Sequence, residues 1–136
     1  MPHSAQILDD LGIVVLRFWG DIDYGEIRNV FDEAVNLPGF RPKLKAVADC
    51  RKANTAMTGR DIQKLASDAQ KTDPLWGESK WAILASSDLI FGLSRMYSAL
   101  TSDYEVKTHV FRTVDDANEW LDVDVPVSEI LLGAVE

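Results

Sequence analysis

Two pairs of side chains in this sequence could do nucleophilic or acid–base chemistry. Cys50 ends one apolar run and His109 lies within another, so an imidazole could activate the thiol if the fold brought the two together. A cysteine in a buried strand is far more often a small apolar filler than a nucleophile. Asp21 and Asp49 lie at adjacent predicted strand ends and could form a carboxylate pair, yet aspartates there more often cap a turn or helix. We therefore expect a protein that is not an enzyme.

Metal and cofactor sites find little support in the same sequence. Neither of the two histidines, His3 and His109, has acidic or thiol neighbours at the spacing of metal ligands, and His3 lies in an N-terminal segment that we expect to fray. No Gly-x-Gly-x-x-Gly or Walker-type run occurs, because the glycines are scattered at predicted turns and caps. The sequence therefore predicts no metal and no cofactor.

Charge and composition limit the kinds of partner and the cellular compartment that we expect for this protein. The 136 residues include 22 acidic and 14 basic ones, for a net charge of −8, which repels nucleic-acid backbones and anionic bilayers. The N-terminus lacks a secretory signal, and no apolar run reaches the roughly 18 residues of a membrane span. Cys50 is the single cysteine, so no internal disulfide can form. We expect one cytoplasmic domain over residues 1–136 that binds no nucleic acid and does not insert into membranes.

The order of apolar patterns predicts an α/β fold. An opening hairpin joins residues 5–8 to 13–19, and Gly20-Asp21 ends its second strand. Further strands are predicted over residues 44–50, 80–85 and 105–112. Helices are expected to begin after the capping residues Asp23, Thr58, Ser87 and Thr113. The result is a mixed, mostly parallel sheet of about five strands with an N-terminal hairpin, covered by about four helices.

Two expectations concern the connections of this fold. Residues 73–77, with Asp73-Pro74 and Trp76-Gly77, are predicted to form a loop. Ligands of open parallel sheets usually lie beyond the carboxyl ends of the strands, which here include Gly20-Asp21 and Asp49-Cys50-Arg51.

The third predicted helix, which begins after Ser87, carries the sharpest binding candidates. Phe91 falls off its apolar stripe, so it either protrudes toward a partner or cavity or helps to bury a helix covered on two sides. Gly92 costs a helix interior about 1 kcal/mol relative to alanine, which favours close approach of a backbone or ligand. Arg95 is expected to pair with a carboxylate, with Asp49 and Asp88 among the candidates, rather than to grip a ligand. The inward stripe itself includes Leu89, Leu93, Met96, Tyr97 and Leu100.

Several short runs, taken in order, match a known family. They are Phe18-Trp19-Gly20-Asp21, Val47-Ala48-Asp49, Phe91-Gly92-Leu93-Ser94-Arg95-Met96, Val110-Phe111-Arg112 and Ala117-Asn118-Glu119-Trp120-Leu121. In this order they resemble STAS domains, specifically the SpoIIAA-like family of small bacterial proteins. The resemblance implies a mixed sheet covered by helices. It also implies an anti-sigma-factor-antagonist-like role, in which a protein partner docks near one helix N-terminus.

This sequence departs from the family's pattern at the phosphorylation site. In partner-switching members a strand ends in Asp-Ser-Ser-Gly and the second serine takes the phosphate, whereas the matching run is Asp49-Cys50-Arg51-Lys52. Arg51 would attract an anion instead of becoming one. Thr55 and Thr58 are nearby hydroxyls, but Thr58 is better explained as a helix cap. We therefore expect a binding protein without the usual phospho-serine switch.

Two functions remain open at this point. The first is a non-enzymatic STAS-like binding or regulatory module that acts through protein–protein interaction. The alternative arises because the SpoIIAA-like family resembles lipid-transfer domains of the CRAL-TRIO type. It is a carrier or sensor of a small hydrophobic, lipid-like ligand held between the third helix and the sheet. The predicted ligand- or partner-binding residues are Asp49, Arg51, Phe91, Gly92, Arg95 and Met96.

A C-terminal extension, residues 122–136, lies beyond the resemblance. Its aliphatic side chains are numerous, and burying each is worth about 1.5–3 kcal/mol, so we expect the segment to dock on its own domain or across a two-fold axis. Symmetric dimers are the commonest oligomers of soluble proteins, and we predict a homodimer.

Overall fold

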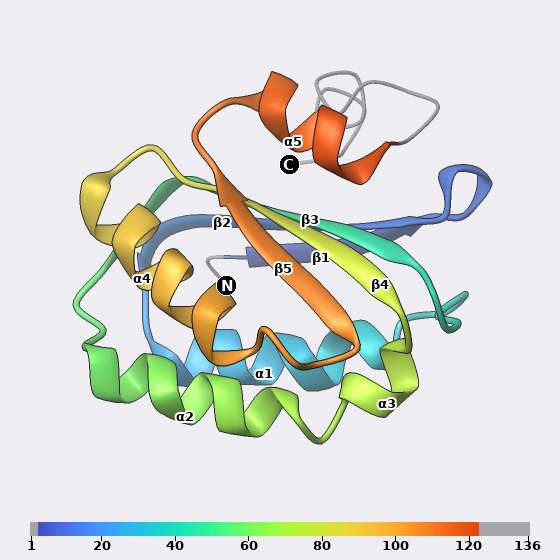
Figure 1. Ribbon diagram of the computed structural model, residues 1–136, viewed down its shortest axis with the longest axis horizontal. Helices are drawn as coiled ribbons and strands as arrows, with labels where there is room; N and C mark the ends of the chain where they lie inside the picture. Colours follow the sequence, from blue (N-terminus) through green and yellow to red (C-terminus); the bar gives the residue numbers. More distant parts are fainter. Residues whose placement is uncertain (1–2, 123–136) are drawn as a thin grey trace.

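The computed structural model describes residues 3–122 and has five strands and five helices in that range (Figure 1). In chain order these are β1 (His3–Leu8), the short 3-10 turn η1 (Asp9–Leu11), β2 (Ile13–Ile22), α1 (Tyr24–Val35), β3 (Lys45–Thr55), α2 (Gly59–Ala69), the one-turn α3 (Asp73–Trp76), β4 (Ser79–Leu84), α4 (Asp88–Leu100), β5 (Val106–Phe111) and α5 (Val114–Leu121). Within these residues no helix is both long and apolar enough to cross a bilayer. The predicted docking of the C-terminal extension falls outside the described residues, and the homodimer stays a prediction.

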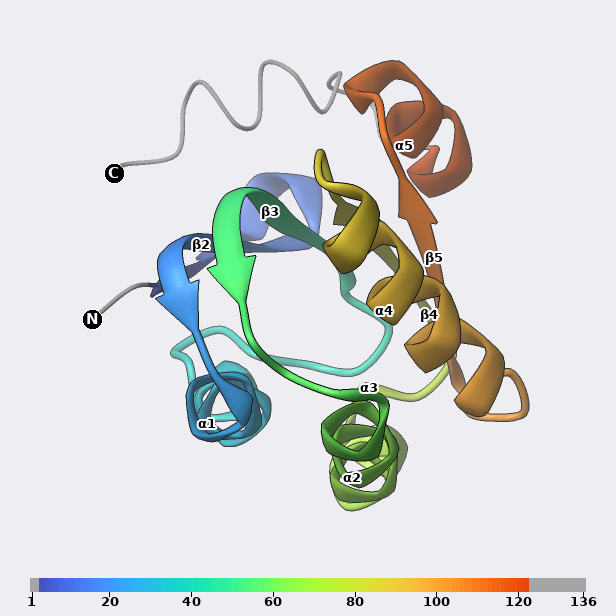
Figure 2. The same cartoon turned by 90° about the vertical axis from the view of Figure 1, so that its left-hand side faces the viewer.

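The strands lie in the sheet in chain order, β1-β2-β3-β4-β5. β1 pairs antiparallel with β2 and every later neighbour is parallel, which confirms the predicted mixed sheet with an N-terminal hairpin. Crossovers between parallel strands share one hand, so a sheet built steadily in one direction places its crossover helices on one face. Figure 2 shows α1, α2 and α4 on that face and α5 on the other. From β2 to β5 the strand order does not reverse, so these strands contain no topological switch point.

Two hydrophobic cores lie on opposite faces of the sheet. Side chains alternate along a strand, so in β2 Val14 and Leu16 join the core beneath α1, α2 and α4, while Ile13 and Val15 join the smaller core beneath α5. The helix starts follow the predicted caps. The side chains of Asp23, Thr58, Ser87 and Thr113 each accept a hydrogen bond from a backbone N–H three residues on.

β2 and β3 extend beyond their predicted ends. β2 continues through Gly20-Asp21 to Ile22, and β3 continues to Thr55, because the two strands go on pairing with each other. The predicted strand end at Gly20-Asp21 is therefore wrong, and Asp49-Cys50-Arg51 lies inside β3. The predicted loop over residues 73–77 is also partly wrong, since it contains α3 and the fully buried Trp76.

The buried face of α4 matches the predicted stripe only in part: Leu93, Met96 and Tyr97 pack against the core, but at both ends of the helix the buried position is displaced by one residue. Leu89 and Leu100 are 53% and 41% exposed, whereas the neighbouring Ile90 and Thr101 are buried. One residue corresponds to about 100° around a helix. The displacement arises because α4 packs against β5 on one side and against α2 on its flank, so its apolar arc serves two neighbours.

His3 was expected in a frayed terminus and instead is buried between β1 and α1. Its Nδ1 contacts Glu26, and its Nε2 lies 2.8 Å from Oε1 of Glu33. Burial by itself lowers the pKa of His3, but hydrogen bonds to Glu33 and Glu26, and the charges of these carboxylates, outweigh it and raise the pKa above its ordinary 6.5. The imidazolium thus ties the edge strand to α1.

His3→Gln is expected to destabilise the protein by about 1.5–3 kcal/mol at pH 6, the usual value of hydrogen bonds to charged groups. Because folding raises the pKa of His3, its contribution is fully present below pH 6.5 and is lost as the pH rises through the folded pKa. Urea unfolding of wild type and variant at pH 6 and pH 9 measures this. Arg28→Gln, on the same helix, should retain the pH dependence of the wild type. An equal or larger effect of His3→Gln at pH 9 would show that the imidazolium does not bridge these carboxylates.

Candidate functional site

An apolar cavity of about 110 Å³ lies between the sheet and the layer of α1, α2 and α4. Figure 2 shows the sheet and these three helices end-on. Its lining comes from six of these elements and the β3–α2 loop: Leu16, Phe18, Ile22, Ile27, Val30, Phe31, Ala48, Cys50, Thr55, Met57, Ile62, Leu65, Trp81, Ile83, Ile90, Leu93, Ser94 and Tyr97.

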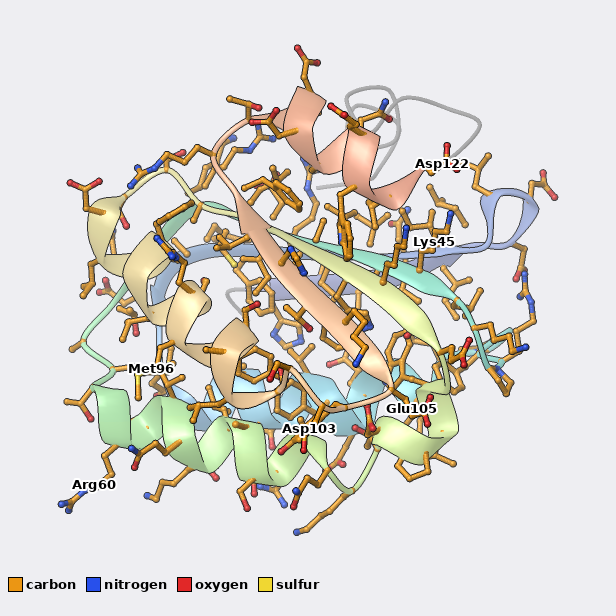
Figure 3. The ribbon with its side chains drawn as sticks, viewed as in Figure 1. Lys45, Arg60, Met96, Asp103, Glu105 and Asp122 are labelled. Carbon is orange, nitrogen blue, oxygen red and sulfur yellow. The ribbon has the colours of Figure 1, made fainter. Side chains whose placement is uncertain are left out.

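The cavity has two physical causes. The side chains that β3 presents to the helix layer are all small: Ala46, Ala48, Cys50 and Ala53. In addition, α2 packs mainly on α1 and α4 rather than on the sheet, and so lies apart from the strands. Figure 3 shows Met96 reaching from α4 to the start of α2, where a Cβ placed on Gly59 would come within 3.4 Å of the Met96 Cε.

Polar groups at the cavity are few and strongly desolvated. Burial, followed by the charge of Asp49, raises the pKa of the Cys50 thiol to about 12. Burial likewise raises the pKa of the Tyr97 hydroxyl, with smaller contributions from Tyr104 and Asp73. The Nε1 of Trp81 is buried and has no hydrogen-bond partner among the described residues. This environment keeps the thiol and phenol neutral and disfavours a charged ligand.

The six predicted site residues fall into two groups on opposite faces of the sheet. Met96 and Phe91 lie on α4, on the cavity side, whereas Asp49 and Arg51 lie on the other face and line a separate groove. Gly92 is exposed, and no described atom beyond its own helix backbone and chain neighbours lies within 4 Å of a Cβ placed there, so no described backbone approaches it closely. The predicted residues therefore do not form one site.

The two carboxylates predicted as partners of Arg95 pair with other arginines. Asp49 accepts hydrogen bonds from Arg51 at 2.8 and 3.0 Å, and Asp88 pairs with Arg112 at 2.8 Å. The predicted pairing of Arg95 with one of these carboxylates is wrong. The Arg112 guanidinium also lies over the Phe91 ring, 4.2 Å from its centre, so Phe91 is half-buried beneath a cation.

The catalytic pairs considered from the sequence are not brought together. Cys50 belongs to the core beneath α4, while His109 stacks on Trp120 of α5, on the other side of the sheet. Asp21 lies opposite Asn54, which is about 16 Å along β3 from Asp49. Within residues 3–122 no three His, Cys, Asp or Glu side chains gather at a metal-binding distance.

The junction of β3 and α2 does not contain the run predicted to match the phosphorylation motif. Asp49-Cys50-Arg51-Lys52 is inside the strand, and Thr55 and Thr58 stand at the junction instead. The Thr55 hydroxyl donates to the Ile22 carbonyl at 2.8 Å, and Thr58 forms a reciprocal capping box with Asp61. Both hydroxyls thus hold the backbone in place.

Ile90, Ser94 and Trp81 were not among the predicted site residues. Ile90 and Ser94 are the buried positions of α4, and the displacement of its buried face explains why the sequence pattern missed them. A usable signal was present in the alternating small residues of β3, Ala46, Ala48 and Cys50, which leave space on one face of a central strand.

Comparison with known proteins shows a match in fold. No family model matches this sequence, and no curated protein matches it. Among solved structures, an uncharacterized protein of the DUF3478 family from Shewanella loihica PV-4, described as having a SpoIIAA-like fold, superposes with a TM-score of 0.53. The identity is 17%, and the match covers 88% of this chain and 93% of the other. The chain therefore has a SpoIIAA-like, STAS-like fold, as its motif order predicted.

Proposed function

We propose that this protein is a non-enzymatic binding module whose ligand is a small apolar molecule held in the cavity between α4 and the sheet. The observation that supports the proposal is the cavity itself. It lies between α4 and the sheet, where a carrier or sensor of a small hydrophobic ligand would hold that ligand. A fully packed core at this place would have left no room for such a ligand.

The energetics of the cavity support a bound molecule. Unfilled apolar space in a protein core is unfavourable, by about 24 cal/mol per Å³ in large-to-small core substitutions. An apolar ligand that fills the space recovers dispersion contacts with the lining. The volume suits a molecule close to benzene in size, or one section of an alkyl chain.

A regulatory role is compatible with the same geometry. The inner face of α4 lines the cavity with Ile90, Leu93, Ser94 and Tyr97, while Leu89 and Leu100 on the same helix are exposed. A ligand that shifts α4 would therefore change a surface on which a protein partner can dock. We propose further that the protein acts on a protein partner in the cytoplasm and that it has no enzyme activity.

Benzene, titrated into the protein, is expected to raise its unfolding temperature and to shift the NMR signals of cavity residues. At ten times Kd, one bound molecule stabilises the fold by about 1.4 kcal/mol. Ser94→Leu places a larger side chain at the cavity wall and should abolish the effect. Ala99→Leu, on the exposed side of the same helix, should bind as the wild type does.

Overpacking costs about 1–3 kcal/mol, so Ala48→Val provides a milder second block if Ser94→Leu does not fold. The proposal is wrong if the wild type shows no stabilisation at millimolar benzene. It is also wrong if both cavity variants bind benzene as well as Ala99→Leu does.

A further inference from the structure

A second, smaller cavity lies next to the apolar one, between α3 and the connection from α4 to β5. Its volume is about 20 Å³, which is enough for one water molecule or one hydroxyl group. Phe31, Trp81 and Tyr97 line both cavities. Because the same side chains form a wall of each, no more than one layer of side chains separates the two spaces. The other described residues that line the small cavity are Ala69, Thr72, Asp73, Trp76, Thr101, Tyr104, Val106 and Thr108.

Several residues that line the small cavity carry hydroxyl groups, in contrast to the apolar lining of the large one. Thr72, Thr101 and Thr108 are all buried. The Thr101 hydroxyl donates to the Tyr97 carbonyl at 2.9 Å, and the Tyr104 hydroxyl donates to a backbone carbonyl of α2 at 2.7 Å. A hydroxyl that donates one hydrogen bond keeps lone pairs with which it can accept another. The small cavity therefore offers acceptors to a group that donates a hydrogen bond.

Asp73 adds a carboxylate to the same lining. Its two oxygens accept hydrogen bonds from the backbone N–H groups of Glu105 at 2.9 Å and of Val106 at 3.0 Å, which hold it in place. A fixed carboxylate repels an anionic group placed beside it. Burying any charged group in so small a space also costs far more than burying a neutral hydroxyl. The small cavity thus favours a neutral donor.

Two of the threonines adjoin the wall that the cavities share. Thr108 of β5 lies directly opposite Trp81 of β4 in the sheet. Thr101 follows Tyr97 by about one helical turn at the end of α4. A molecule that fills the apolar cavity and carries one polar group therefore has acceptors for that group just beyond the shared wall.

We propose that the bound molecule is a small neutral alcohol or phenol, with its hydrocarbon part in the apolar cavity and its hydroxyl in the small one. This inference rests on the proposed apolar site and names the chemical class of its ligand. Phe31 and Tyr97, whose ring centroids are 6.4 Å apart, form part of the shared wall, and rotation of either ring opens it to the hydroxyl.

Phenol and toluene are the matched probes, in an NMR titration of the full chain, because a hydroxyl and a methyl group are close in size. A hydroxyl buried without a partner would weaken phenol more than tenfold relative to toluene. We expect phenol instead to bind at least as tightly as toluene. Benzoate and benzylamine, which are both charged at pH 7, should each bind at least tenfold more weakly than phenol, to judge from the cost of burying a charge.

Thr108→Val nearly preserves the shape of the side chain and removes its hydroxyl. It should weaken phenol roughly fivefold and leave the affinity for toluene unchanged. Thr101→Val serves as the second variant if Thr108→Val fails to fold. Ser67→Ala, which removes an exposed hydroxyl from α2, is the control and should bind both compounds as the wild type does.

The outcomes separate this inference from the proposed apolar site. If toluene binds and phenol binds more than tenfold more weakly, the hydroxyl site is wrong and the apolar site stands. If neither compound binds at millimolar concentration, both proposals are wrong. Equal affinities of the wild type, Thr108→Val and Thr101→Val for phenol would also overturn the hydroxyl site, as would tighter binding of benzylamine than of phenol.

Discussion

Replacing Trp76 by alanine is expected to destabilise the protein by about 3–5 kcal/mol, which is a large share of the stability of an ordinary domain. Trp76 is 1% exposed. Its ring meets Phe40 edge-on at 5.0 Å and Trp81 at 4.7 Å between centroids. Its carbonyl also accepts a hydrogen bond from the Lys43 backbone N–H at 2.7 Å. The side chain thus joins α3, the α1–β3 connection and β4, and alanine would leave a void among all three.

Urea unfolding followed by circular dichroism measures this change. Leu75→Ala is the matched control, because Leu75 is the preceding residue of the same helical turn and is 51% exposed. We expect the control to alter the free energy of unfolding by less than about 0.5 kcal/mol. A difference below 1 kcal/mol between the two variants would contradict the role of Trp76 as an anchor.

Cys50 in the native protein is expected to react with iodoacetamide at pH 8 about a thousandfold more slowly than a thiol in an unfolded chain. The thiolate is the reactive form, and a pKa of about 12 leaves roughly one thiol in ten thousand ionised at that pH. The same burial that raises the pKa also limits access of the reagent. This behaviour is the opposite of what a catalytic thiol requires.

Mass spectrometry of timed samples gives the rate, with the same protein in guanidinium chloride as the reference. Because Cys50 lines the cavity, saturation with benzene should slow the native reaction further if opening of the cavity admits the reagent. Native modification within tenfold of the denatured rate would show that Cys50 is exposed or activated, and would revive the catalytic interpretation.

The starts of the four longer helices could be predicted from the sequence because a cap is a local interaction. Thr58 and Asp61, or Ser87 and the N–H of Ile90, lie three residues apart and need no other part of the chain. The hairpin of β1 and β2 was also predictable, since its two strands are adjacent in sequence and are joined by the turn-forming residues Asp9-Asp10-Leu11-Gly12. These features, with the alternation of strand and helix, were enough to predict the mixed sheet.

Strand ends and buried helix faces depended on partners distant in the sequence. β2 and β3 continue to Ile22 and Thr55 because each supplies the other with backbone hydrogen bonds. This pairing cannot be predicted from the composition of either segment alone. His3 is buried because two carboxylates of α1 come to lie against it, although a histidine near a chain end has no local reason to be ordered. The register shift between Arg17 and Trp19 likewise arises in this pairing and has no local signal in the sequence.

The candidate cavity depends partly on the sequence of one strand and partly on the tertiary structure. The small residues Ala46, Ala48 and Cys50 are visible in the sequence and determine that one face of β3 presents little side-chain volume. Whether that face is filled depends on where the helices lie, and only the packing of α2 on α1 and α4 leaves the space open. Side-chain volume is a property of each residue, but an unfilled volume is a property of several elements at once, because any one of them could have moved in to fill it.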